Sequence, residues 1–188
     1  MTTYNESVIT APTLPFAGIK AFAYEIVLVA AAVALPVAAH LFNAPVRYLL
    51  PMHWAIILAG LVYGWRAGAL AGLVVPSISY LLSGMPYPSV LPSMTAELLI
   101  YGFVTGILRE KTGLNAFSSV AIALAAGRIA FIAFAFFTNS EVTSFASYFQ
   151  TALMPGLGAA VCQIILLPFV AKWWINSVKR RNEMARTH

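Results

Sequence analysis

The stretch PMHWAIILAGLVYGWRAGALAGLVVPSISYLLS, residues 51–83, decides how this chain folds. It is almost wholly apolar, and its length suits either one long interrupted membrane helix or two short ones. Arg66 separates these alternatives, because in a single helix it would lie near the bilayer centre, where an arginine costs about 2.5 to 3.5 kcal/mol on insertion scales. A turn at residues 64–68 places Arg66 among the lipid headgroups instead. We therefore predict two short helices.

The composition of the whole chain supports a bilayer as its solvent. Of 188 residues, 61% are hydrophobic and only 9% are charged, which is far from the balance of a soluble globular domain. At about 20 apolar residues for each crossing, this length accommodates about six helices and no separate soluble domain. The single cysteine, Cys162, lies in an apolar run and is interpreted as a packing residue.

Apolar runs separated by Pro, Gly, Ser and charged residues predict an all-α integral membrane protein with a compact bundle of six transmembrane helices. The runs cover residues of about 21–42, 53–65, 67–83, 93–108, 117–137 and 151–175. The first is interpreted as a permanent helix, because it is too long for a signal peptide and about twenty mixed residues precede it. The predicted parts are an amino-terminal segment 1–19, a six-helix domain 20–178 and a basic tail 179–188.

The basic residues sort to one side of this topology. An even number of helices puts both termini on one side, and the Lys and Arg residues expected there are Lys20, Arg66, Arg109, Lys111, Lys172, Lys179, Arg180, Arg181 and Arg186. By the positive-inside rule that side is the cytoplasm. The net charge of +5 then reflects mostly this bias, with contact to anionic lipids as a second interpretation. A nucleic-acid partner is not expected.

Two stripes of small residues predict close helix contacts. The alanine stripe consists of Ala30, Ala34 and Ala38 in the first helix. The glycine stripe consists of Gly64, Gly68 and Gly72, which run from the turn into the third helix. For the alanine stripe two interpretations stay open. It packs inside the bundle, or it docks a partner membrane protein.

Three polar residues lie deep in the predicted helices. Arg128 is about midway along the fifth run, Glu97 is in the outer part of the fourth, and Gln163 is midway along the sixth. An uncompensated charge at such depth is expensive, so Arg128 is expected to face the bundle interior and to find an anion. That anion is either Glu97, in a structural pair, or a group on a ligand that Glu97 helps to orient.

Further polar and aromatic residues predict an outward-facing pocket around these groups. Tyr101 lies four residues after Glu97, on the same helix face, while His53 and Trp54 begin the second helix and Tyr80 lies in the outer half of the third. The proline-rich loop 83–92 either covers this pocket or is a stiff re-entrant connector. The predicted ligand-binding residues are His53, Trp54, Tyr80, Met85, Tyr87, Glu97, Tyr101, Arg128 and Gln163.

Catalysis is disfavoured by what the sequence lacks. It contains no aspartate, no H-E-x-x-H and no P-loop, and its three histidines have no metal-ligand spacing. We therefore expect no metal, no cofactor and no ATP hydrolysis by this chain itself.

The residues of 51–108 resemble the substrate-binding S components of energy-coupling factor (ECF) transporters. The most specific segments are PMHWAIILAG, GWRAGALAG, LLSGMP and AELLIYGFVTG, and the similarity extends over residues of about 20–175, where AAGRIAF and PGLGAAVCQIILLPFV agree with it more weakly. The resemblance implies a protein of the prokaryotic plasma membrane that captures a vitamin or related micronutrient from outside. It also implies association with a transmembrane T component and two cytoplasmic ATPases.

The resemblance further implies a role for the alanine stripe, because the small-residue face of the first helix contacts the T component in this family. External loops after the first and third helices cap the ligand site in S components, and the matching loops here are 43–52 and 83–92. Two other functions remain open from the residues themselves. One is a standalone small-solute transporter or channel coupled to an ion or proton gradient, and the other is a noncatalytic membrane scaffold.

Overall fold

A computed structural model of the chain describes residues 12–42, 46–138 and 154–184. The helices in these ranges are α2 (Ile19–Leu41), α3 (Val46–Leu49), α4 (Pro51–Tyr63), α5 (Trp65–Ser83), α6 (Leu91–Lys111), α7 (Ala116–Thr138), the short 3-10 helix η2 (Met154–Gly156) and α9 (Leu157–Met184). No strand occurs in these ranges. Residues 1–11, 43–45, 139–153 and 185–188 lie outside the described part of the chain. The predictions for segment 1–19, loop 43–52, run 151–175 and tail 179–188 therefore fall partly outside it.

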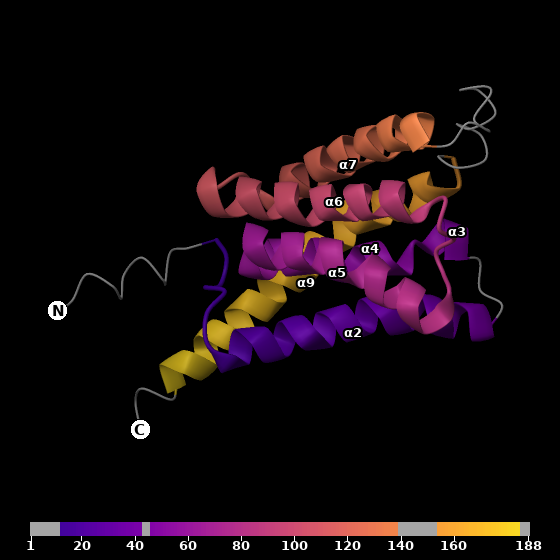
Figure 1. Cartoon of the computed structure of the whole chain (residues 1–188). Coiled ribbons are helices and arrows are strands. Elements are labelled where there is room, and N and C mark those ends of the chain that lie inside the picture. Colours follow the sequence, from indigo (N-terminus) through magenta and orange to yellow (C-terminus); the bar gives the residue numbers. More distant parts are fainter. Residues whose placement is uncertain (1–11, 43–45, 139–153, 185–188) are drawn as a thin grey trace.

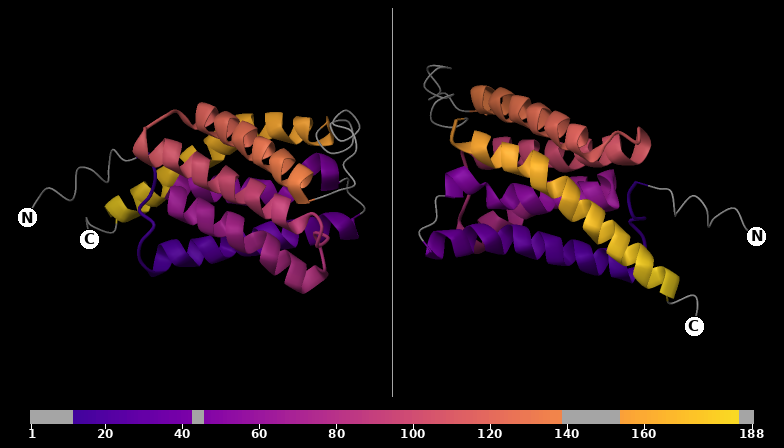
Figure 2. Two further views of the ribbon diagram at one scale, coloured as in Figure 1. Left: turned by 45° about the horizontal axis from the view of Figure 1, so that its top comes forward. Right: turned by 180° about the vertical axis from the view of Figure 1, so that it is seen from behind.

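The long helices lie side by side in one bundle, and the chain runs back and forth between its two ends (Figure 1). The beginning of α2 and the end of α9 lie at the same end, as an even number of passes requires (Figures 1 and 2). Five described helices are long and apolar enough to cross a membrane, namely α2, α5, α6, α7 and α9. The prediction of an all-α bundle is confirmed, although the sixth predicted crossing, α4, is shorter than the others.

The short helix α4 forms the centre of the bundle. It has 13 residues, so at 1.5 Å per residue it spans about 20 Å, less than the roughly 30 Å hydrocarbon layer. All of its residues except Pro51 and Trp54 are buried, and it packs against α2, α5, α6 and α9. An apolar helix surface suits either lipid or other helices, and in this structure other helices surround α4.

The break predicted at Arg66 is present. α4 ends at Tyr63 and α5 begins at Trp65, with Gly64 between them at a φ of 83°. This positive φ favours glycine, because a Cβ would clash in the left-handed region. Arg66 is exposed, and its guanidinium lies 4.9 Å from the centre of the Trp65 ring. The interpretation of residues 51–83 as two helices is therefore confirmed.

The glycine stripe packs against α6. A Cβ added to Gly68 would overlap the backbone of Gly102, and one added to Gly72 would overlap the backbone of Leu98. From the other side, a Cβ on Gly106 would overlap the backbone at Gly64 and Trp65. These helices touch backbone to backbone, which confirms the close contact predicted for this stripe.

The alanine stripe faces mostly away from the bundle interior. Ala30 and Ala34 are exposed and Ala38 is half-buried. The inner face of α2 is formed by other residues: Ala21, Glu25, Leu28 and Ala32 are all buried. Of the two interpretations of the stripe, packing inside the bundle is therefore wrong for Ala30 and Ala34.

Candidate ligand-binding site

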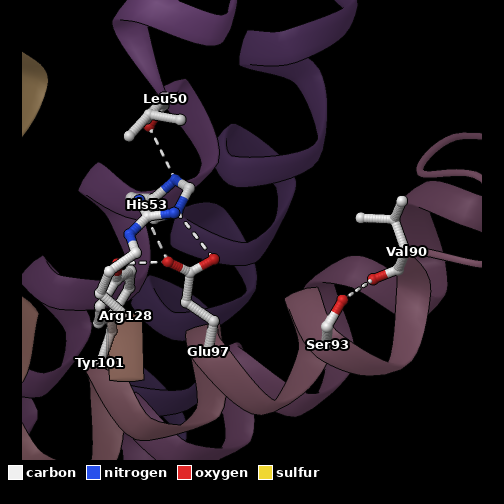
Figure 3. Close-up of polar contacts among 7 residues, drawn as sticks. All are labelled: Leu50, His53, Val90, Ser93, Glu97, Tyr101 and Arg128. Atoms are coloured by element: carbon white, nitrogen blue, oxygen red, sulfur yellow. Dashed lines mark hydrogen bonds and ion pairs between the residues drawn. The ribbon is translucent and has the colours of Figure 1, made fainter. Parts of the chain in front are cut away.

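A buried polar cluster joins α4, α6 and α7 around the carboxylate of Glu97 (Figure 3). The Tyr101 hydroxyl donates to Glu97 Oε1 at 2.5 Å. Arg128 Nη2 lies 3.2 Å from the same oxygen, and His53 Nε2 lies 3.9 Å from Oε2. The side chains of His53 and Glu97 are 4% and 3% exposed, whereas that of Arg128 is 24% exposed. The contact between Arg128 and Glu97, one of the two alternatives for Arg128, is present.

The local sequence explains why these groups converge. Glu97 and Tyr101 are four residues apart, so they lie on one face of α6. The residue before Arg128 is Gly127, where a Cβ would overlap the ring of Tyr101. The missing side chain lets α7 approach α6 closely enough for Arg128 to reach the carboxylate. The ring of Phe131, one helical turn further along α7, lies 5.6 Å from the guanidinium carbon of Arg128.

His53 is held by the turn that precedes its helix. Leu50, between α3 and α4, has a φ of 45°, a left-handed conformation that is uncommon for a residue with a side chain. Its carbonyl oxygen accepts hydrogen bonds from the backbone N–H of His53 at 3.1 Å and from Nδ1 of the imidazole at 3.3 Å. Because a carbonyl only accepts, Nδ1 carries the proton.

The other imidazole nitrogen of His53 is left without a direct hydrogen bond. Nε2 is buried, and no partner within hydrogen-bonding distance exists in the described part of the chain. Its separation of 3.9 Å from Glu97 is too long for a hydrogen bond. Nε2 faces the carboxylate of Glu97 and is closed off from solvent (Figure 3).

A pocket of about 650 Å³ opens beside His53, at the end of the bundle opposite the beginning of α2 and the end of α9 (Figure 1). It lies among the ends of α2 and α5, the beginnings of α4 and α6, and the loop between α5 and α6. Its lining residues are Pro36, Val37, Leu50, Pro51, Met52, His53, Ser79, Ser83, Met85, Pro86, Tyr87, Val90 and Met94. The volume lies in the range of pockets for small organic ligands, and the lining is almost entirely apolar.

The nine predicted ligand-binding residues fall into three groups. His53, Met85 and Tyr87 line the pocket. Glu97, Tyr101 and Arg128 lie in the polar cluster that contacts His53. The remaining three, Trp54, Tyr80 and Gln163, belong to neither.

Each residue of the third group has an environment of its own. Trp54 donates its indole N–H to the carbonyl of Leu49 at 2.9 Å, so it ties α4 to α3. Tyr80 is half-buried on α5. Gln163 on α9 is completely buried, and its side-chain oxygen and nitrogen have no hydrogen-bond partner among the described residues.

Sequence reasoning missed several of the lining residues. For Leu50 the sequence contains a local signal of a break before α4. Pro51 follows it, and a residue before proline avoids the helical region. Pro36 and Val37 had none, because they reach the pocket only through the packing of α2 beside α5. Loop 83–92 supplies Met85, Pro86, Tyr87 and Val90 to the wall, as expected of a loop that covers the pocket.

Comparison with known proteins identifies the chain. A family model described as "ECF transporter, substrate-specific component" matches residues 11–178, which is most of the chain. The chain belongs to this family. No curated protein and no solved structure matches it.

Membership of the ECF family gives the coarse function of the molecule. The chain is a multi-pass membrane protein and the substrate-specific component of an ECF transporter, a substrate-binding subunit and not an enzyme. The family associates with a T component and ATPases and takes small-molecule substrates. Within the described residues, no three His, Cys, Asp or Glu side chains gather in a group that could hold a metal ion.

Proposed function

We propose that this ECF substrate-specific component captures a small, largely apolar organic molecule, a vitamin or related micronutrient, in the pocket beside His53. The observation that carries the proposal is the apolar pocket itself, whose wall includes the buried side chain of His53. The pocket supplies the area that binds the body of the ligand. The few polar residues of the wall, namely His53, Ser79 and Ser83, are the proposed groups that orient it.

The ion pair behind His53 has a positioning role in this proposal. Arg128 and Glu97 already neutralise one another, and Tyr101 occupies a further lone pair of the same carboxylate. The cluster therefore keeps His53 in place at the pocket wall without itself requiring a charged ligand. Our proposal therefore treats the Arg128–Glu97 pair as structural and does not use Arg128 to bind an anionic group of the ligand.

The proposed orientation puts the pocket outside the cell. Lys20, Arg66, Arg109, Lys111 and Lys172 lie towards the end of the bundle away from the pocket, as their places on the helices require. By the positive-inside rule this end faces the cytoplasm of a prokaryotic cell. In this arrangement the segments 1–19 and 179–188 flank the transmembrane domain 20–178 on the cytoplasmic side.

The exposed alanine stripe is the proposed contact for the T component, through which two ATPases would power release of the ligand inside. Small side chains let a partner helix approach closely, and two of these three alanines are free of contacts that bury them within the bundle. Lipid tails fill this face until the partner binds.

A ligand screen by thermal shift on the purified chain tests the proposal. A ligand present at 100 times its dissociation constant stabilises the protein by about 2.7 kcal/mol. We expect this shift to vanish in Met94→Trp, which fills the pocket, and to persist in Leu81→Trp, because Leu81 is 79% exposed and outside the pocket. An undiminished shift in Met94→Trp would contradict the assignment of this pocket. Ion-dependent flux in liposomes containing this chain alone would support a standalone transporter instead.

A further inference from the structure

A second pocket, of about 400 Å³, lies at the opposite end of the molecule from the proposed ligand site. It is formed where α6 ends, α7 begins and α9 passes. Neither substrate capture nor the alanine stripe uses its residues. We refer to it as the basic pocket, after the side chains of Arg109, Lys172 and Lys179 in its lining.

The electrostatics of the basic pocket favour an anion. Three basic side chains and no acidic one line it. It also contains the first residues of α7, a helix of 23 residues with no acidic residue in its first turn. The positive end of that helix dipole therefore adds to the positive side chains. Asn115 caps this end by accepting from the Ser118 N–H at 2.8 Å.

Arg109 is fixed in place without a carboxylate partner. Its Nη1 donates to the carbonyl of Leu114 at 2.7 Å, and its Nη2 donates to that of Pro12 at 3.2 Å. Its Nε is buried and has no hydrogen-bond partner in the described ranges. Among the ion pairs of these ranges none involves Arg109. Its positive charge is therefore held in position and is not neutralised by the protein around it.

The apolar part of the basic pocket is exposed at the surface of the bundle. Phe117 of α7 and Phe169 of α9 are 43% and 60% exposed, and their rings meet edge to face with centroids 5.5 Å apart. A hydrated inorganic anion would leave these rings unused. An amphiphile with an anionic head and a hydrocarbon tail matches both parts of the pocket.

We propose that the basic pocket binds one anionic phospholipid, with its phosphate at Lys172, Lys179 and Arg109 and an acyl chain along Phe117 and Phe169. Basic pockets between transmembrane helices at the cytoplasmic surface are suited to anionic headgroups, which that leaflet carries. The lipid would hold the end of α6 and the beginning of α7 against α9.

Lipid binding to the purified full-length chain tests this proposal by native mass spectrometry, with dioleoyl phosphatidylglycerol and dioleoyl phosphatidylcholine as the probes. We expect tighter binding of phosphatidylglycerol. At about 1 kcal/mol for each basic residue near the lipid surface, Lys172→Gln should weaken phosphatidylglycerol binding about fivefold. The matched control is Arg66→Gln, which removes one exposed charge at the same end but outside the basic pocket. It should change binding less than twofold.

Two further measurements distinguish binding of a whole lipid from binding of a free phosphate group. Phe169→Ala should weaken phosphatidylglycerol binding, and glycerol 3-phosphate should fail to displace the lipid at equal concentration. Equal binding of the two lipids, equal losses in Lys172→Gln and Arg66→Gln, or displacement by glycerol 3-phosphate would each overturn the proposal. Circular dichroism of each variant checks that its helices are retained.

Discussion

The glycine stripe of α5 and the alanine stripe of α2 have the same four-residue spacing and opposite surroundings. The glycines lie against the backbone of α6, where any Cβ would overlap it. Two of the three alanines face outward, and a different set of residues joins α2 to the bundle. A small-residue pattern in a membrane helix therefore predicts a close contact but does not identify its partner.

Residue type gives part of the explanation for this difference. Glycine has no Cβ, so two helices can touch backbone to backbone. Alanine retains a methyl group that packs acceptably against lipid when no protein partner is present. The difference suggests that the glycine stripe builds the fold and the alanine stripe serves assembly. Substitutions at Gly68, Ala32 and Ala34 test this division, and one at Glu97 tests the polar cluster beside the glycine contacts.

The largest effect is expected for Gly68→Leu, because its side chain would have to occupy the space of the Gly102 backbone. We expect loss of folded protein in detergent. Gly68→Ala should still fold but lose roughly 1 to 3 kcal/mol through overpacking. Gly158→Ala is the control, because nothing lies within 4 Å of a Cβ placed there. Thermal unfolding followed by circular dichroism measures both alanine variants, and equal stability would refute a structural role for the stripe.

The next largest effect concerns the polar cluster, which joins α6 to α7 beyond the glycine contacts. Glu97→Gln removes the carboxylate and leaves Arg128 without its ion-pair partner. We expect a loss of roughly 2 kcal/mol, less than for a fully buried pair because Arg128 is partly exposed. Replacing Arg128 with Met in the same variant should restore part of the stability. Failure of this rescue would indicate that Glu97 acts on the ligand and not on the fold.

Ala32→Leu tests the inner face of α2, two residues away from the alanine stripe. Ala32 is 0% exposed, so the larger side chain should cost about 1 to 3 kcal/mol. Ala34→Leu on the outer face should change the stability of the isolated chain by less than about 0.5 kcal/mol. Unfolding curves of the two variants give the comparison directly. Similar losses would mean that α2 lies differently in the bundle.

The smallest effect on stability, that of Ala34→Leu, should accompany a large effect on assembly. We expect at least a tenfold weaker association with the T component, measured by co-purification from membranes that contain all subunits. Ala125→Leu, at an exposed position on α7, is the matched control and should assemble normally. If Ala34→Leu also assembled normally, the alanine stripe would not be the docking face.

Much of the fold could be predicted because the signals were local. Arg66 predicted the break between α4 and α5, since a mid-membrane arginine costs more than a turn. Pairing of Arg128 with Glu97 was one of two alternatives that charge burial allowed, and the structure has that contact. The central place of α4 was not predicted, because an apolar surface suits lipid as well as neighbouring helices.

The ligand site could be predicted only in part, because its residues come from separate helices. His53, Met85 and Tyr87 were found from their places at helix ends and in a proline-rich loop. Trp54 and Tyr80 share the same end of the molecule but do not line the pocket. Gln163 was chosen for its depth, and depth alone does not distinguish a pocket wall from a packed interior.

The sequence by itself determined the bilayer as solvent, the number of long helical segments and the distribution of charge between the two ends. These follow from hydropathy and from the cost of placing charge in hydrocarbon, which act on each segment separately. Only the tertiary structure decided which face of α2 points inward and which residues from separate helices line the pocket. Lipid tails and protein interiors are equally apolar, so hydrophobicity cannot distinguish a helix face that meets lipid from one that meets another helix.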